Sequence, residues 1–173
     1  MSTETHPVWT VYDKLRTARL NVKYYGCRLQ GMQRTNTFME VTLALTAPTS
    51  AITGYGLWKQ GPGLVIWGIF SGVAAIVALC KPIFGLTRRI AKMEGVVAGY
   101  RLLDFDLMEI KGSIEQERSF TSALKSQFRK ASKSEKELVS RVPEARPNKK
   151  LLRKCRAEVE SELPVSSFFI PEE

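Results

Sequence analysis

The stretch Val41–Cys80 constrains the fold of this chain more than any other feature, because Lys59 is its only charged residue. Charge-rich segments flank it, so the average of 44% hydrophobic residues over the whole chain hides the contrast. A chain of 173 residues forms one compact core, and that core has little room for some forty nearly uncharged residues in a row. The stretch therefore favours membrane helices over the alternative, two buried helices of a globular protein.

Two spans fit into this stretch. Gly63–Cys80 is apolar, and about 20 apolar residues are enough for a helix to cross the hydrocarbon core of a bilayer. Val41–Trp58 is less apolar, because it holds several threonines and Pro48, but it too is uncharged. We therefore expect an all-α membrane protein with a transmembrane helical hairpin, its spans over about 39–58 and 63–82.

The basic residues around the hairpin predict its orientation. Lysine and arginine stay on the cytoplasmic side of a membrane, and here they gather before the first span and after the second. We therefore expect a multi-pass protein with both chain ends in the cytoplasm. The flanking basic residues are Lys14, Arg16, Arg19, Lys23, Arg28 and Arg34 before the hairpin, and Lys81, Arg88, Arg89, Lys92 and Arg101 after it.

The first span carries a candidate pore lining. Thr42, Thr46, Thr49 and Thr53 are spaced four, three and four residues apart and so share one helical face. These threonines either line a water path in an oligomer or bond to backbone carbonyls of their own helix. Pro48 removes one backbone hydrogen bond, so it is a candidate kink and gate.

The second span carries a strip of small residues at Gly68, Gly72 and Ala75. Small residues let the backbones of two helices approach closely in lipid, where no hydrophobic drive brings them together. The strip is therefore a candidate helix-packing face.

Heptad patterns flank the hairpin. In the N-terminal segment, 1–36, apolar residues alternate at spacings of three and four, which predicts an amphipathic cytoplasmic helix with a coiled-coil seam that ends near Thr35 and Asn36. The segment 83–142 has a second seam and predicts one long cytoplasmic helix. The hairpin would hold the two helices side by side as an antiparallel coiled-coil-like bundle, and faces left open predict a homo-oligomer. The seam residues are Val8, Val11, Leu15, Ala18, Val22, Tyr25, Leu29 and Met32, then Ile90, Met93, Val97, Tyr100, Leu107, Ile110, Ile114, Thr121, Leu124 and Phe128.

A basic run lies near the C-terminus. From Arg129 to Arg156 there are eleven basic residues against three glutamates, in a chain whose net charge is +9. Such a run can hold anionic lipid, a nucleotide or nucleic acid, and it can equally be a solvated charged helix. It has no aromatic residue on which the bases of a single strand would stack. The candidate anion-binding residues are Arg129, Lys130, Lys133, Lys149, Lys150, Arg153 and Lys154.

The last segment, 143–173, predicts a short basic helix and an apolar tail. Pro143 and Pro147 mark a turn, and Asn148 is placed to cap a helix over Lys149–Leu163. The tail is apolar enough to dock on this subunit, on a neighbour or on a separate protein.

No catalytic motif is present, so we expect no enzyme, no cofactor and no metal site. The sequence has no phosphate-binding glycine loop, no nucleophile elbow and no zinc-protease motif, and His6 is the only histidine. Asp104, Asp106 and Glu109 are interpreted as an acidic patch on the surface of a helix. The cysteines, which we expect as free thiols in a reducing compartment, are Cys27, Cys80 and Cys155.

The order of these elements resembles the SLATT domain, a bacterial membrane effector with two membrane helices. The resemblance rests on a basic amphipathic helix, DKLRTARLNVKYYGCRLQGMQR, then two close spans, then KPIFGLTRRIAKMEGVVAGYRLLDFDLMEI. It covers about Val8 to Phe128 and is a likeness of architecture, since that family has no catalytic signature to match.

The resemblance implies an oligomeric pore-forming or membrane-disrupting effector in the inner membrane, acting in anti-phage defence by abortive infection. A nucleotide signal or a separate sensor protein would trigger it. No sensor domain of recognised type follows the hairpin, which leaves the trigger open. The alternative is a non-conducting membrane anchor or scaffold, whose coiled coil and basic C-terminal region recruit a partner protein or nucleic acid.

Overall fold

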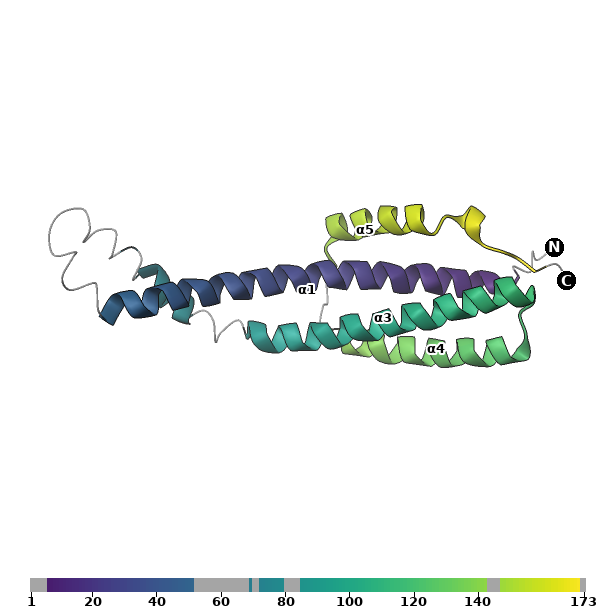
Figure 1. The fold of residues 1–173 in the computed structure, drawn as a ribbon, viewed down its shortest axis with the longest axis horizontal. Coiled ribbons are helices and arrows are strands. Elements are labelled where there is room, and N and C mark those ends of the chain that lie inside the picture. Colours follow the sequence, from purple (N-terminus) through teal and green to yellow (C-terminus); the bar gives the residue numbers. More distant parts are fainter. Residues whose placement is uncertain (1–5, 52–68, 70–71, 80–84, 143–146, 172–173) are drawn as a thin grey trace. The chain divides into compact units, whose positions relative to one another are not determined.

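The computed structural model describes residues 6–51, 69, 72–79, 85–142 and 147–171, without the side chains of 45–51 (Figure 1). In this part of the chain every regular element is a helix, as expected. The chain divides into two compact units, the bundle unit (Met1–Arg28 and Lys92–Glu173) and the middle unit (Leu29–Ala91). The elements are α1 (Val8–Ala51), α3 (Leu86–Glu117), α4 (Ser122–Arg141), α5 (Lys149–Glu162), a 3₁₀ turn η1 (Val165–Ser167) and a helical segment over 72–79.

The expected transmembrane hairpin is wrong. Among the residues described, none of the helices is both long and apolar enough for a membrane crossing. The expected localisation as a multi-pass inner-membrane protein falls with it. Of the uncharged stretch, only its beginning, 41–51, belongs to a long described helix, α1. Charged residues such as Glu40 and the interspersed threonines lower the hydropathy of that helix. Of the second expected span, 63–82, the structure describes only residues 69 and 72–79.

Helix α1 does not end at the expected break near Thr35. The Thr35 hydroxyl donates to the carbonyl of Gly31 at 3.0 Å, and the Asn36 side-chain amide donates to Glu40 at 3.0 Å. Both bonds stay within the helix, so these two side-chain donors do not offer the backbone another conformation. The helix therefore continues to Ala51.

The core of the bundle unit is the antiparallel pairing of α1 with α3. Tyr25 stacks on Tyr100 with ring centroids 5.6 Å apart, and Arg19 pairs with Asp104, so residues further along α1 meet earlier residues of α3. The seam expected from the heptads is buried here. Its fully buried members are Val8, Val11, Leu15 and Ala18 on α1, and Met93, Val97, Tyr100, Leu107, Ile110 and Ile114 on α3.

The single long helix expected over 83–142 is two helices in the structure. Helix α3 ends at Glu117, and Arg118 takes a left-handed backbone conformation with φ of 49°. The Thr121 hydroxyl then accepts a hydrogen bond from the Leu124 amide and caps α4. Leu138, near the end of α4, lies beside Gly99 in the first half of α3. The two helices therefore run antiparallel, and the chain reverses between them. Since the heptad ladder runs through the turn unbroken, it gave no sign of the reversal.

Helix α5 begins where the sequence predicts. The Asn148 side chain accepts hydrogen bonds from the amides of Lys150 and Leu151 and caps the helix. The apolar tail docks on its own subunit, because Phe168 stacks on Tyr12 at 4.1 Å and the Tyr12 hydroxyl donates to the carbonyl of Phe169. Figure 1 shows α5 and α4 on opposite sides of the α1–α3 pair.

Helix α4 packs against α3 at Gly99 but not at Gly95. Substitution by alanine should therefore have opposite effects on stability at these two glycines. Gly95→Ala should stabilise the protein by about 0.5–1 kcal/mol, because a Cβ there meets nothing within 4 Å and alanine favours helix. Gly99→Ala should cost about 1–3 kcal/mol relative to Gly95→Ala, because its Cβ would lie 2.2 Å from Cδ2 of Leu138. Urea unfolding measures both.

Leu138→Ala supplies the control. In that background, Gly99→Ala should lose its penalty, since the clashing methyl group is gone. A penalty that survives Leu138→Ala would show that α4 does not pack at this position.

Candidate anion-binding surface

Asp104 is the buried charge of the bundle unit. Its side chain is 11% exposed, and Arg19 Nε donates to it at 2.9 Å. Burial raises the pKa of Asp104, while the hydrogen bond and charge of Arg19 lower it, and burial is the larger effect. The sequence interpretation of this residue as surface is therefore wrong, whereas Asp106 and Glu109 beside it are exposed as expected.

Acidic residues of α4 and α5 also form ion pairs with basic side chains of α1. Lys23 reaches both Glu162 at 2.7 Å and Glu158 at 3.3 Å, and the bond to Glu162 raises the pKa of Lys23. Lys14 pairs with Glu135 of α4. These carboxylates contact α1, so basic side chains outnumber acidic ones on the outer faces of α4 and α5, where Glu137 and Glu160 are exposed.

The outer face of α4 carries a basic stripe. Its members are spaced four, four and three residues apart, so they share one helical face about 16 Å long. All are exposed, and one acidic residue borders the face, Glu137, which lies one turn after Lys133 and pairs with Arg141 at 3.6 Å. Within the described residues, Lys125 lies 5.7 Å from the Phe120 ring, and no ion pair to the other three is present. We define the α4 basic stripe as Lys125, Arg129, Lys133 and Lys136.

The first two turns of α5 form a second basic surface. They carry five exposed basic residues, while the acidic residues follow in its second half. The helix dipole is positive at the N-terminus, so cations there are unfavourable. A carboxylate at the same place would stabilise the helix by a few tenths of a kcal/mol. An arrangement that breaks a local rule of stability marks a place where function is expected. We define the α5 basic end as Lys149, Lys150, Arg153, Lys154 and Arg156.

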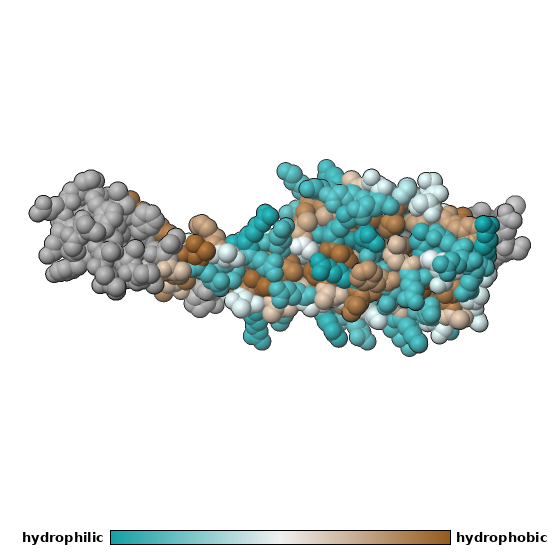
Figure 2. All heavy atoms as spheres, viewed as in Figure 1, coloured by the Kyte–Doolittle hydropathy of each residue, from teal (hydrophilic) through white to brown (hydrophobic). Residues whose placement is uncertain are grey.

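The basic run of the sequence is therefore not one site. All seven predicted anion-binding residues are exposed, but α4 and α5 carry them on opposite sides of the α1–α3 pair (Figure 1). Lys130 lies off the stripe, in a groove between α3 and α4 beside Asp106 and Glu109. Figure 2 shows hydrophilic side chains gathered over α5 and along the α4 edge of the bundle unit.

Sequence reasoning missed three members of these surfaces. Lys125 and Lys136 complete the α4 stripe, and Arg156 completes the basic end of α5. The signal was present in the helical spacing of Lys125, Arg129, Lys133 and Lys136, but counting charge along the chain did not use that spacing. Reading the run by helical face would have found them.

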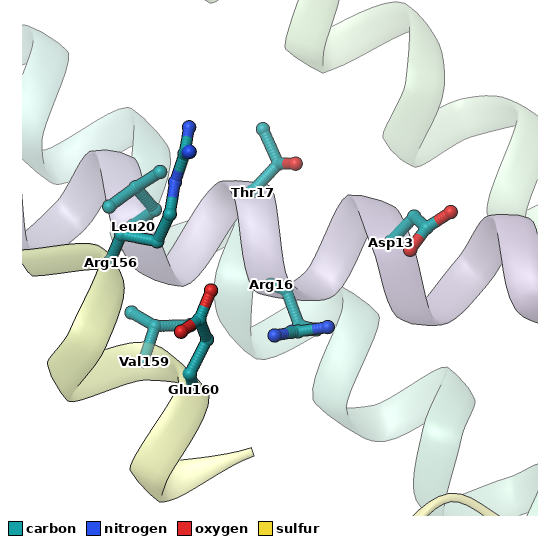
Figure 3. Close-up of a pocket in the computed structure, with 7 residues that line it drawn as sticks. All are labelled: Asp13, Arg16, Thr17, Leu20, Arg156, Val159 and Glu160. Carbon is teal, nitrogen blue, oxygen red and sulfur yellow. The ribbon is translucent and has the colours of Figure 1, made fainter. Parts of the chain in front are cut away.

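A groove of the bundle unit lies between α1 and α5 (Figure 3) and has a volume of about 340 Å³. Arg16 and Thr17 of α1 and Arg156 of α5 line it, but so do the carboxylates of Asp13 and Glu160. The two positive and two negative charges cancel. The groove therefore has no preference for a small anion such as a nucleotide phosphate.

The residues predicted for the membrane hairpin are only partly described. The Thr42 hydroxyl donates to the carbonyl of Phe38 at 2.8 Å, which agrees with the interpretation that threonines bond within their own helix. Gly72 and Ala75 lie in the segment 72–79, and both are exposed. The remaining predictions fall outside the described side chains or residues, at Thr46, Pro48, Thr49, Thr53 and Gly68.

Comparison with known proteins finds no match to this chain among protein-family models, curated proteins or solved structures.

The buried pair predicts a pH-dependent cost for removing Arg19. At neutral pH Arg19→Met leaves the Asp104 carboxylate buried without its partner, which should cost about 2–3 kcal/mol in partly exposed surroundings. Because burial raises the pKa of Asp104, the folded protein binds this proton more tightly than the unfolded chain does. Stability due to this group therefore falls as pH rises from the unfolded pKa through the folded one.

Urea unfolding between acidic and neutral pH tests this. The cost of Arg19→Met should shrink towards acidic pH, where protonated Asp104 needs no cation. Lys111→Met, which removes a same-helix pair with Glu115, is the control and should cost less than about 1 kcal/mol at every pH. A cost of Arg19→Met that does not change with pH would contradict the assignment.

Proposed function

We propose that this chain is a helical scaffold that recruits nucleic acid through the phosphate backbone, with the α4 basic stripe as its principal contact. The observation that carries the proposal is the segregation of charge in the bundle unit. Acidic side chains such as Glu135, Glu158 and Glu162 are engaged with α1, while the stripe residues project outward. The chain has a net charge of +9, and this arrangement exposes part of that basic excess to solvent on α4.

The form of the stripe supports an extended ligand over a nucleotide. Its basic side chains follow one helix face for about 16 Å, comparable to the run of phosphates along a strand. An enclosed nucleotide site would need basic groups that converge in a cavity. The groove between α1 and α5 and the groove between α3 and α4 both hold acidic as well as basic residues, so neither fits such a site.

The composition of the stripe supports nucleic acid over a protein partner. Interfaces between proteins are enriched in aromatic residues and depleted in lysine, whereas the stripe is three lysines and one arginine. Lysine is a point charge suited to phosphate and carries no sequence information. Binding should therefore be independent of base sequence and dominated by counterion release.

A charge reversal on the stripe tests the proposal. Four contacts to duplex DNA predict that the logarithm of affinity falls with the logarithm of salt with a slope of about −3.6. Arg129→Glu with Lys133→Glu should weaken binding at least tenfold and roughly halve that slope. Fluorescence anisotropy of a labelled duplex over a series of salt concentrations measures both quantities.

The matched control is Lys92→Glu with Arg101→Glu, which changes the net charge equally on exposed residues of α3. It should leave the slope nearly unchanged. Equal losses from the two double variants would show a diffuse effect of net charge and contradict the stripe. Binding to anionic vesicles or to an acidic peptide, with no binding to DNA, would assign the stripe to those partners instead.

A second function is favoured by the middle unit, namely the membrane-disrupting defence effector that the SLATT resemblance implies. Half of the exposed large apolar residues of the described chain lie in this unit, although it is the smaller one. Exposed apolar side chains in such number mark an interaction surface. They are Phe38, Val41, Ile69, Val73, Ile76 and Leu79.

Dye release from vesicles tests the effector. The full chain, added with and without candidate nucleotides, should release dye, and Ile76→Asp should reduce release severalfold because it places a charge on the apolar surface. Leu102→Asp is the matched control, since Leu102 is equally exposed, at 66% against 63%, but lies on α3 of the bundle unit. No release under any condition, or equal loss from both variants, would remove this candidate.

A further inference from the structure

Two cysteines of the bundle unit come from helices that are far apart in the sequence. Cys27 lies on α1 and is exposed, and Cys155 lies on α5 and is buried, with 1% of its surface exposed. Both carry free thiols in the structure. The question is whether the packing of α1 against α5 brings the two sulfur atoms into reach of each other.

The register of the two helices places them together. Lys23 of α1 pairs with Glu158 of α5 at 3.3 Å, and Arg19, one turn earlier on α1, lies 3.9 Å from Glu162, one turn later on α5, so the two helices run antiparallel. Cys27 lies four residues after Lys23, and Cys155 lies three residues before Glu158. The same antiparallel register therefore brings the two cysteines level with each other.

The environment of Cys155 agrees with this proximity. Burial is the main cause that raises the pKa of its thiol, and the nearby Cys27 adds to the effect. Small side chains at a helix contact also allow the short separation between Cα atoms, about 4.4–6.8 Å, that a disulfide needs.

We propose that Cys27 and Cys155 form a dithiol site that a low-molecular-weight disulfide converts to an intramolecular disulfide between α1 and α5. The exposed Cys27 reacts first: it loses its proton, and its thiolate attacks one sulfur of the small disulfide and expels one thiolate. Cys155 then loses its proton and attacks the Cys27 sulfur of the mixed disulfide, expelling the second thiolate. The two released thiolates take up the two protons, so one protein disulfide and two small thiols result.

The two steps differ in rate because the two thiols differ in environment. The thiolate is the attacking species, and burial of Cys155 holds its proton at neutral pH. The mixed disulfide on Cys27 should therefore accumulate before the ring closes, and closure should accelerate as pH rises. The new bond would link α5 covalently to α1 and so fix the position of the α5 basic end relative to α1.

The experiment uses the full chain carrying Cys80→Ala, which removes the one other cysteine. Oxidised glutathione is the probe, and intact mass with thiol titration is the readout. We expect both thiols to disappear with a final mass lower by two hydrogens, after a transient glutathione adduct. Closure of so long a loop should also raise the melting temperature by roughly 5–10 °C, reversed by reductant.

Two variants make the result decisive. Cys155→Ser should stop at a stable glutathione adduct on Cys27. Cys27→Ser with Ser126→Cys keeps one exposed and one buried thiol but moves the exposed one to α4, on the other side of the α1–α3 pair (Figure 1), and should also stop at an adduct. The proposal fails if the Cys80→Ala chain stops there too, or if disulfide-linked dimers form in place of the internal bond.

Discussion

The burial of one face of α1 is the interaction on which the bundle unit depends. Val8, Val11, Tyr12 and Leu15 are fully buried, so the rest of the unit covers one face of the first two turns of α1. α3 meets α1 through stacked tyrosines and the Arg19–Asp104 pair, α4 through Lys14, α5 through Lys23 and the tail through Tyr12. Burying a side chain of this kind is worth about 1.5–3 kcal/mol, so these few positions outweigh all the ion pairs around them.

The same helix organises the charges. Lys14, Arg19 and Lys23 follow one another along α1 at spacings of five and four. Lys14 pairs with a carboxylate of α4, Arg19 with carboxylates of α3 and α5, and Lys23 with two carboxylates of α5. Ion pairs with partly exposed members contribute little energy, about 0.2–1 kcal/mol, so their main effect is on orientation. By drawing some acidic groups towards α1 they leave an excess of basic side chains on the outer faces of α4 and α5. The packing of the core and the surface potential are therefore linked through α1.

The sequence predicts the parts of this fold that depend on local periodicity. The Asn148 cap, the first half of the α1 seam and most of the α3 seam follow from spacing and side-chain chemistry alone, and the structure confirms them. The second half of the α1 seam, Val22, Tyr25, Leu29 and Met32, is only half-buried. The reversal at Arg118 was hidden, because an amphipathic helix that folds back keeps its heptad register and Thr121 fits both a helix interior and a cap. The membrane hairpin was inferred from the absence of charge between Val41 and Cys80, which does not establish the sustained apolar helix that a span requires. Likewise, a count of charge found the basic run but did not assign its residues to the separate faces of α4 and α5.

Helix α5 is held differently from the other helices of the bundle unit. Only Cys155 and Val159 are buried along its length, so its apolar contribution is small and its ion pairs with Lys23, the Tyr24 bond to its cap and the docked tail matter more. Elements with few buried apolar contacts open at a lower free energy than the core does. The unfavourable placement of Lys149 and Lys150 in its first turn lowers that free energy further. A covalent bond at Cys155 would therefore act on the element whose docking is weakest, where a single constraint changes the population of the docked state most.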